Sequence, residues 1–156
     1  MMLHRRDWVM RMVKQLTDAL ARILGLRKAG RHDEALALIG DTLREVLGEV
    51  VDVAERVDEK TAASLLGHAD AIRAYAQLLT ERAAVREEMQ DVPGAATDRM
   101  RALRMHLAAV AQTGTRVDAA THNAIMELAR RVDTTELTPD HHALLERVRG
   151  HANGPP

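Results

Sequence analysis

Histidine is the residue type in this chain that does metal and proton-transfer chemistry most readily near neutral pH. The chain holds eight histidines and no cysteine, so disulfides, thiolate zinc sites and a cysteine nucleophile are excluded. No glutamate stands three residues before a histidine, as the Glu-x-x-His motif of di-iron helical bundles requires. The remaining candidates are Asp118 with His122, four residues apart, and the adjacent His141 and His142. We interpret these as surface residues, and the sequence therefore predicts no metal and no cofactor.

Motifs for nucleophilic catalysis and for phosphate binding are incomplete. Ser64 is the only serine, and it lies beside leucines without the glycine elbow of serine hydrolases. Gly25 and Gly30 have the spacing of a phosphate-binding loop, but no Lys-Ser/Thr pair follows them. The adjacent Glu87 and Glu88 point to different sides of a helix, where we interpret them as solvated. The sequence therefore predicts no enzyme activity and no catalytic residues.

Composition indicates a helical protein with an aliphatic core. The chain has 156 residues, a usual length for one domain, and Trp8 and Tyr75 are its only members of the Phe, Trp and Tyr class. Leu, Val, Ile, Ala and Met must fill the core, and this choice favours helices over sheets. No apolar run approaches the ~20 residues of a membrane span, and the charged first residues, without an uninterrupted apolar stretch behind them, lead us to expect no secretory signal. We expect no membrane contact and a cytoplasmic location, with which the lack of cysteine agrees.

Apolar residues recur at helical spacing and predict an all-α fold of six or more helices, in one domain over residues 1–150. The expected helices cover about 7–28, 33–47, 50–57, 58–66 and 69–90. A further helix ends near Gly114, one runs from Asp118 to about 132, and one follows Thr138-Pro139. The valine-rich residues 50–57 would also suit a strand, and we prefer a helix because no partner strand stands elsewhere. Residues 151–156 are expected to form a disordered tail.

The first two predicted helices meet within three residues, in the stretch LRKAGRHDEALALIG at positions 26–40. Gly30 suits the left-handed conformation that ends a helix, and Asp33 and Glu34 suit the first turn of the next one. So short a connection makes an antiparallel hairpin, in which the small Ala35 lies against the first helix. The core side of the first helix is expected to carry Val9, Val13, Leu16, Leu20, Ile23 and Leu24.

A resemblance to tetratricopeptide repeats rests on this turn. The residues that match the turn and second helix of such a repeat are Gly30, Asp33, Glu34, Ala35, Leu36, Ile39 and Leu43. A weaker match lies 60 residues later, from Asp91, and Gln90 replaces its glycine. The regular spacing is ~34 residues, so residues 49–66 are expected to be an insertion. The opening of the chain, with Asp7-Trp8 and Arg11, also resembles a family of small bacterial all-helical proteins without an assigned activity. These resemblances imply an irregular stack of antiparallel helical hairpins.

Charge is divided unevenly between the first two helices. Residues 1–31 hold eight Lys or Arg against two Asp, a balance of +6, whereas residues 32–60 hold nine acids against three bases, a balance of −6. We favour the interpretation that a basic helix lies beside an acidic one and their fields cancel locally. The alternative is a basic stripe that binds an acidic partner. Nucleic acid is not expected, because the pI is near 6.7 and aromatic residues for stacking are lacking.

The sequence thus predicts a non-enzymatic protein-interaction or scaffold domain. The alternative is a small-ligand-binding or catalytic helical domain, which requires polar residues in its core. Thr42 and Tyr75 are the only polar residues that stand at predicted core positions. His68 and His106 are expected to be solvated or half-buried. Tetratricopeptide domains that clamp a peptide carboxylate use Lys and Asn, and the first helix offers basic residues without Asn.

The expected partner surface lies at the start of the first helix and contains Trp8, Met10, Arg11 and Lys14. Its apolar residues are too many for one core stripe of ~100°, so Trp8 is expected at the edge of the stripe and Met10 well outside it. Such a surface would bind a protein partner or a second copy of the chain. In the alternative interpretation, residues 49–66 fold back and cover it.

Overall fold

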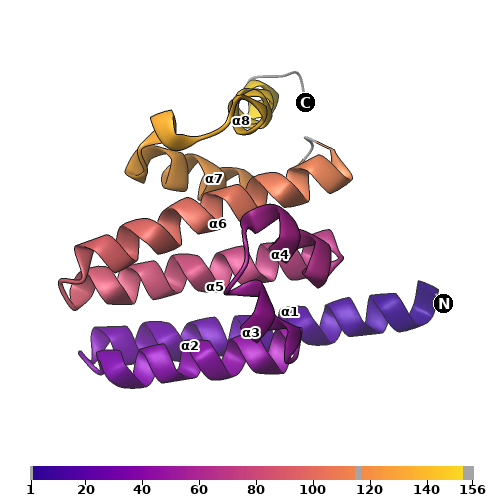
Figure 1. The fold of residues 1–156 in the computed structure, drawn as a ribbon. Coiled ribbons are helices and arrows are strands. Elements are labelled where there is room, and N and C mark those ends of the chain that lie inside the picture. Colours follow the sequence, from indigo (N-terminus) through magenta and orange to yellow (C-terminus); the bar gives the residue numbers. More distant parts are fainter. Residues whose placement is uncertain (1, 115–116, 153–156) are drawn as a thin grey trace.

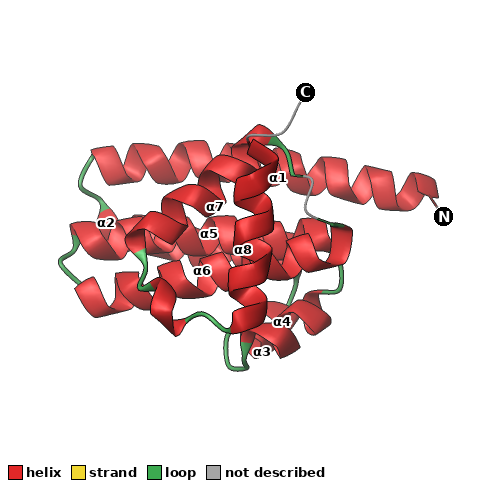
Figure 2. Ribbon diagram, turned by 90° about the horizontal axis from the view of Figure 1, so that it is seen from above, coloured by secondary structure: helices red, strands yellow, loops and turns green. Residues whose placement is uncertain are grey.

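The computed structural model describes residues 2–114 and 117–152. In these residues it contains eight α-helices, one 3-10 helix and no strand, which confirms the predicted all-α fold (Figure 2). The helices are α1 (Met2–Lys28), α2 (His32–Leu47), α3 (Val50–Ala54), α4 (Glu59–Leu66), α5 (Ala69–Glu88), α6 (Val92–Thr113), α7 (Ala119–Arg131) and α8 (Pro139–Ala152). The 3-10 helix η1 (Thr134–Glu136), which the sequence did not predict, lies between α7 and α8.

The helices stack in layers (Figure 1). The antiparallel helices α5 and α6 form the central layer and make the most extensive contact in the molecule. On one side, α1 and α2 pack on α5, and on the other side, α7 and α8 pack on α6. Aliphatic side chains such as Ile72, Leu79 and Leu103 fill the space between the layers, and all three are completely buried. The outer side of the α1–α2 hairpin is therefore an open end of the stack.

The α1–α2 and α5–α6 turns have the same backbone structure, 60 residues apart. Gly30 has a φ of 72°, and Gln90 at the equivalent position has a φ of 66°. In each turn the next N–H donates to a carbonyl five residues earlier at 2.8 Å: Arg31 to Leu26, and Asp91 to Arg86. These are the bonds of a Schellman motif, in which a left-handed residue ends the helix. Gly30 has the turn role that the sequence predicted, and a glutamine takes the same role in the second hairpin.

Buried positions repeat at the same 60-residue spacing. Ala35 and Ala95 are 0% and 1% exposed, and each lies one turn into the second helix of its hairpin. The equivalent buried pairs on the first helices are Met12 with Ile72, Leu16 with Ala76, Ala19 with Leu79, and Ile23 with Ala83. The two hairpins are therefore built on one pattern, and the predicted burial of Ala35 is confirmed.

The predicted core side of α1 was wrong in two places. Val13 and Leu24 were expected to be buried, but they are 50% and 43% exposed. The residues of α1 that are buried are Met12, Leu16, Ala19 and Ile23. Because each residue turns a helix by ~100°, Val13 and Leu24 lie roughly 90–110° from the middle of this line. The contact face is narrow because α1 packs mainly on α2 and α5 and has no layer on its other side.

The segment 49–66 and the end of the chain complete the fold. α3 packs on α2 and α4, and α4 packs on α6 and α5, so the main contacts of this segment are not with α1. The valine-rich stretch 50–57 is helical as preferred, although α3 ends at Ala54.

At the end of the chain, α8 continues through Ala152, two residues into the expected tail, because Gly150 is helical and does not take a left-handed conformation. Residues 153–156 of that tail lie outside the described residues.

Candidate functional site

The structure separates the residues of the expected partner surface. The half-buried ring of Trp8 lies 6.3 Å, centroid to centroid, from the ring of His68, which precedes α5. Met10 is 63% exposed, and Arg11 and Lys14 are exposed as well. Residues two apart on a helix point about 200° away from each other. Trp8 and Met10 therefore lie on nearly opposite sides of α1, and a single flat interface cannot contain both.

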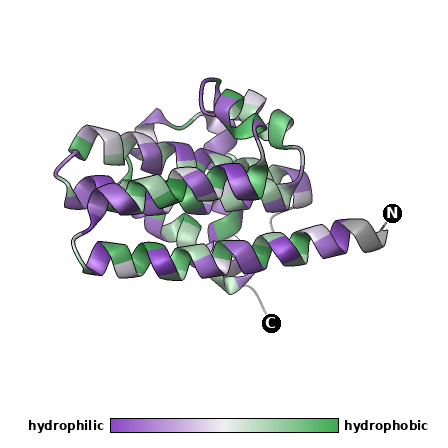
Figure 3. Ribbon diagram, turned by 90° about the horizontal axis from the view of Figure 1, so that it is seen from below, coloured by the Kyte–Doolittle hydropathy of each residue, from purple (hydrophilic) through white to green (hydrophobic). Residues whose placement is uncertain are grey.

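The side of α1 that points away from the stack forms a regular line. Its members, which recur at steps of four and three residues and are all exposed, are Met10, Lys14, Thr17, Ala21, Leu24 and Lys28. The exposed Val13 lies at its edge, so three of the large exposed hydrophobic residues belong to α1. Figure 3 views the molecule from this side, with apolar and polar turns alternating along α1.

α2 presents a matching line on the same open side of the stack. It consists of Asp33, Ala37, Gly40 and Arg44, again at steps of four, three and four residues. Asp33, Ala37 and Arg44 are exposed and Gly40 is half-buried, whereas Ala35 and Ile39 on the other side are completely buried. We call the α1 and α2 lines together the outer face of the first hairpin. Short side chains in its α2 half leave room for another helix to approach closely.

Three charged residues of the outer face lack ion-pair partners in the described part of the chain, whereas the fourth, Arg44, pairs with Asp52 at 3.5 Å. Arg27 of α1 pairs with Glu81 and Glu88 of α5 at 3.1 and 2.7 Å. No ion pair among the described residues joins α1 to α2, and Lys14, Lys28 and Asp33 make none with any element. The basic helix does lie beside the acidic one, and the expected local cancellation of their fields, which needs no direct ion pair, stays a prediction. Their charges point to solvent side by side.

A buried polar cluster joins α5 and α6 to the end of α3, and the sequence did not predict it. Arg82 donates to Glu55 Oε1 at 2.8 Å and to both Asp98 oxygens at 3.0 Å. Asp98, which is 2% exposed, also accepts from Arg86 at 2.8 Å. The Tyr75 hydroxyl donates to Glu55 Oε2 at 3.0 Å. The expectation of almost no polar core residues beyond Thr42 and Tyr75 was therefore wrong, because ion pairing makes such burial possible.

The electrostatics of this cluster indicate a structural role. Burial opposes ionisation of Glu55, but the Arg82 guanidinium outweighs it and holds the pKa of Glu55 below its usual range. Burial, reinforced by the charge of Glu55, raises the pKa of Tyr75 to about 12. At neutral pH every charge thus has a partner, and Tyr75 keeps its proton. Asp98 stands at helical spacing between Ala95 and Ala102, and this periodicity is the signal by which it could have been found.

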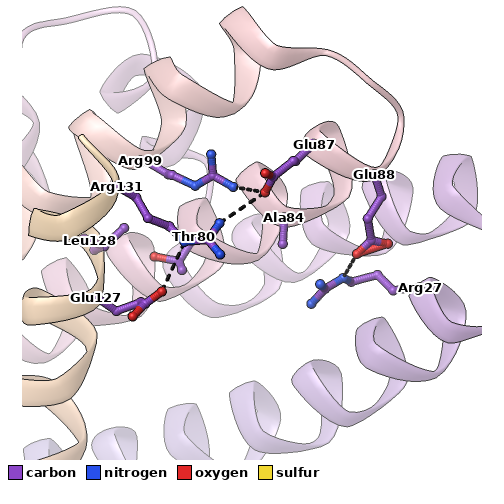
Figure 4. Close-up of a pocket in the computed structure, with 9 residues that line it drawn as sticks. All are labelled: Arg27, Thr80, Ala84, Glu87, Glu88, Arg99, Glu127, Leu128 and Arg131. Atoms are coloured by element: carbon purple, nitrogen blue, oxygen red, sulfur yellow. Dashed lines mark hydrogen bonds and ion pairs between the residues drawn. The ribbon is translucent and has the colours of Figure 1, made fainter. Parts of the chain in front are cut away.

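A cleft of about 340 Å³ lies where α1, α5, α6 and α7 meet (Figure 4). Its charged residues are three arginines and three glutamates, and all of them are paired. The pairs within it are Arg99 with Glu87, Arg131 with Glu87 and with Glu127, and Arg27 with Glu88. The sequence suggested that Glu87 and Glu88 are simply solvated. In the structure both carboxylates are ion-paired. Because the arginines and glutamates already neutralise one another, a charged ligand would have to displace an existing pair.

Two histidines have a buried ring nitrogen without a partner. His106, expected to be solvated or half-buried, is 4% exposed, and its Nδ1 has no hydrogen bond. Burial, with the nearby charge of Arg73, lowers the pKa of His106 to about 4. The Nδ1 of His141 is also unpartnered, and this residue lines a cleft of about 640 Å³ between α4, α6 and α8. Burial, then the charge of Arg104, lowers the pKa of His141.

The candidate metal ligands have other roles. Asp118 caps α7 by accepting the N–H of Thr121 at 2.7 Å, and His122 follows in the first turn of that helix. His32, which begins α2, places Nε2 3.2 Å from Glu88 Oε2. Among the described residues, no three His, Asp or Glu side chains are arranged to hold a metal ion.

No family model matches the chain, and neither the curated proteins nor the solved structures contain a match. No helix in the described residues has the length and apolar character needed to cross a membrane.

Proposed function

We propose that this chain is a non-enzymatic protein-interaction domain that binds through the outer face of the first hairpin. The observation that carries the proposal is the line of exposed Met10, Leu24 and the neighbouring Val13 on a helix whose flanking cations have no partner. Solvent-exposed apolar residues that follow one helix face mark surfaces that another protein covers. The resemblance of the hairpin turn to tetratricopeptide repeats agrees with this role.

Affinity purification from the native cell tests the proposal. The tagged wild type is compared with Val13→Asp/Leu24→Asp, which places two charges on the outer face, and with Val92→Asp as the control. Val92 is 66% exposed at the start of α6, where an aspartate suits the helix N-terminus. We expect the wild type and the control to retain the same protein, and the double variant to lose it. Retention by the double variant would place the binding surface elsewhere.

The alternative function is small-ligand binding in the cleft beside His141. It is favoured by the unpartnered His141 Nδ1 and by the cations Lys60 of α4 and Arg104 of α6, which line this cleft. Three carboxylates line it as well, those of Asp58, Glu59 and Asp140. Arg104 is already paired with Glu59 at 3.2 Å. A screen of small anionic metabolites by thermal shift distinguishes this function, because a ligand of this cleft must lose its effect in His141→Ala and keep it in Val13→Asp/Leu24→Asp.

A further inference from the structure

Gly40 is a glycine that the folded chain does not itself require. It lies in the middle of α2, its φ is not positive, and a Cβ built there meets no atom within 4 Å. Glycine inside a helix is destabilising relative to alanine, so its presence needs a reason. Gly25 of α1 and Gly150 of α8 are also helical with open space around them, so it is the place of Gly40 in the outer face that matters. There, a helix from outside the chain could approach α2 closely, and a side chain at Gly40 would hold it away.

The outer face also resembles a surface that this fold covers elsewhere. The α5–α6 hairpin shares the turn geometry and buried positions of α1–α2, and it has a layer on each side (Figure 1). The α1–α2 hairpin has a layer on one side only. A further helical hairpin is therefore the shape of partner that continues the stack, and each molecule of this protein offers one.

We propose that this hairpin comes from a second copy of the chain, with α1 of each copy lying over α2 of the other around a twofold axis. The inference rests on the proposed function and names the partner of the same face. Charge complementarity at one pair supports it, because Lys28 of α1 and Asp33 of α2 lie at one level and neither has an ion-pair partner among the described residues. The cation in the α2 half of the face, Arg44, is paired with Asp52 at 3.5 Å. The other twofold arrangement places α1 over α1, and like charges then oppose each other.

The hairpin geometry fixes which residues meet. In a tight antiparallel pair, residues equally far from the turn lie at one level, and a twofold axis parallel to the helices preserves that level. The residues at equal levels are Lys28 with Asp33, Leu24 with Ala37, Ala21 with Gly40, and Thr17 with Arg44. Across the interface Lys28 would therefore meet Asp33 of the second copy. Leu24 would lie over Ala37, and Ala21 would pack against Gly40, where both backbones can approach closely.

Sedimentation equilibrium on the full chain tests whether the second copy approaches α2 closely at Gly40. We expect a dimer for the wild type and a dissociation constant raised by about tenfold or more in Gly40→Leu. At a protein concentration well below the wild-type dissociation constant, where both proteins are monomers, the same variant should unfold at an equal or higher urea concentration, because space surrounds Gly40 within the chain. This comparison separates loss of the interface from loss of the fold. Gly150→Leu is the matched control, since Gly150 is also helical with open space around it, and it should dimerise like the wild type. A dimer that Gly40→Leu leaves intact would overturn the proposal.

A charge exchange tests the arrangement of the two copies. Lys28→Glu alone places two acids opposite each other, and Asp33→Lys alone places two bases opposite each other, so each variant should dimerise about tenfold more weakly. Mixed in equal amounts, the two variants restore both pairs, and we expect dimers of near wild-type affinity that contain one of each. Mixing without recovery would contradict the proposed arrangement. A wild type that stays monomeric at high micromolar concentration would overturn self-association, while the affinity purification above would still decide whether another protein binds this face.

Discussion

Mild acid should destabilise this protein through His106. The imidazole is 4% exposed, lacks a partner at Nδ1 and has a pKa lowered to about 4 by burial and by Arg73. In the unfolded chain a histidine titrates near 6.5, so below that pH the unfolded state binds a proton that the folded state resists. A depressed histidine pKa therefore lowers stability as pH falls from the unfolded value toward the folded one. The folded and unfolded pKa values of His106 differ by two to three units, which corresponds to about 3 kcal/mol in the free energy of unfolding.

The loss of unfolding free energy caused by His106 can be measured between two pH values. Between about pH 7.5 and about pH 5, this linkage should remove roughly 2 kcal/mol from the free energy of unfolding. Urea denaturation at both pH values gives that loss for the wild type and for His106→Gln, which is neutral throughout. The pKa of Glu55 lies below its usual range, and it titrates equally in both proteins, so their difference isolates His106. Equal losses of stability in the two proteins would refute the reasoning.

Four further outcomes are expected. Gln90→Gly should raise the free energy of unfolding by roughly 1 kcal/mol, because glycine adopts the left-handed turn conformation without the Cβ clash; an unchanged urea midpoint would count against that strain. Ala35→Leu should lower stability by about 1–3 kcal/mol through overpacking of a completely buried site, and a wild-type midpoint would contradict the packing. Asp98→Ala should cost about 1–3 kcal/mol, since Arg82 and Arg86 each lose one carboxylate while Arg82 keeps Glu55; a loss below about 0.5 kcal/mol, the size of a surface substitution, would show that the cluster is dispensable. Elemental analysis of the purified protein should find no stoichiometric transition metal, and one zinc or iron per chain would reverse the assignment of Asp118.

The hairpin architecture was predictable because its signals are local. Gly30 ends α1 and the acids after it begin α2, and each signal acts within one helical turn. The start of α8 follows from a similar local signal, because Thr138 accepts the N–H of His141 at 3.2 Å. The core side of α1 was less predictable, because Val13 and Leu24 belong to an apolar pattern whose buried part depends on which neighbours pack against it. A pattern along one helix does not contain that information.

The polar interior shows where sequence reasoning stops. Glu55 and Arg82 are 27 residues apart, and their contact at 2.8 Å exists only because the end of α3 lies against α5. Asp98 stands at a core position in the helical period, so its burial could have been inferred although its partners could not. His106 occupies the position equivalent to the buried Val46, and the 60-residue spacing would have predicted its burial.

The central claim, that the outer face of the first hairpin is covered by protein in the cell, is tested most directly by site-specific photo-crosslinking. A photoreactive amino acid replaces Leu24 on this face or Val92 at the start of α6, both of which are exposed, at 43% and 66%. Irradiation in the native cell should give one discrete adduct from position 24, of the mass of two chains where the partner is a second copy, and none from position 92. Absence of any adduct at position 24, or equal adducts at both positions, would contradict the claim.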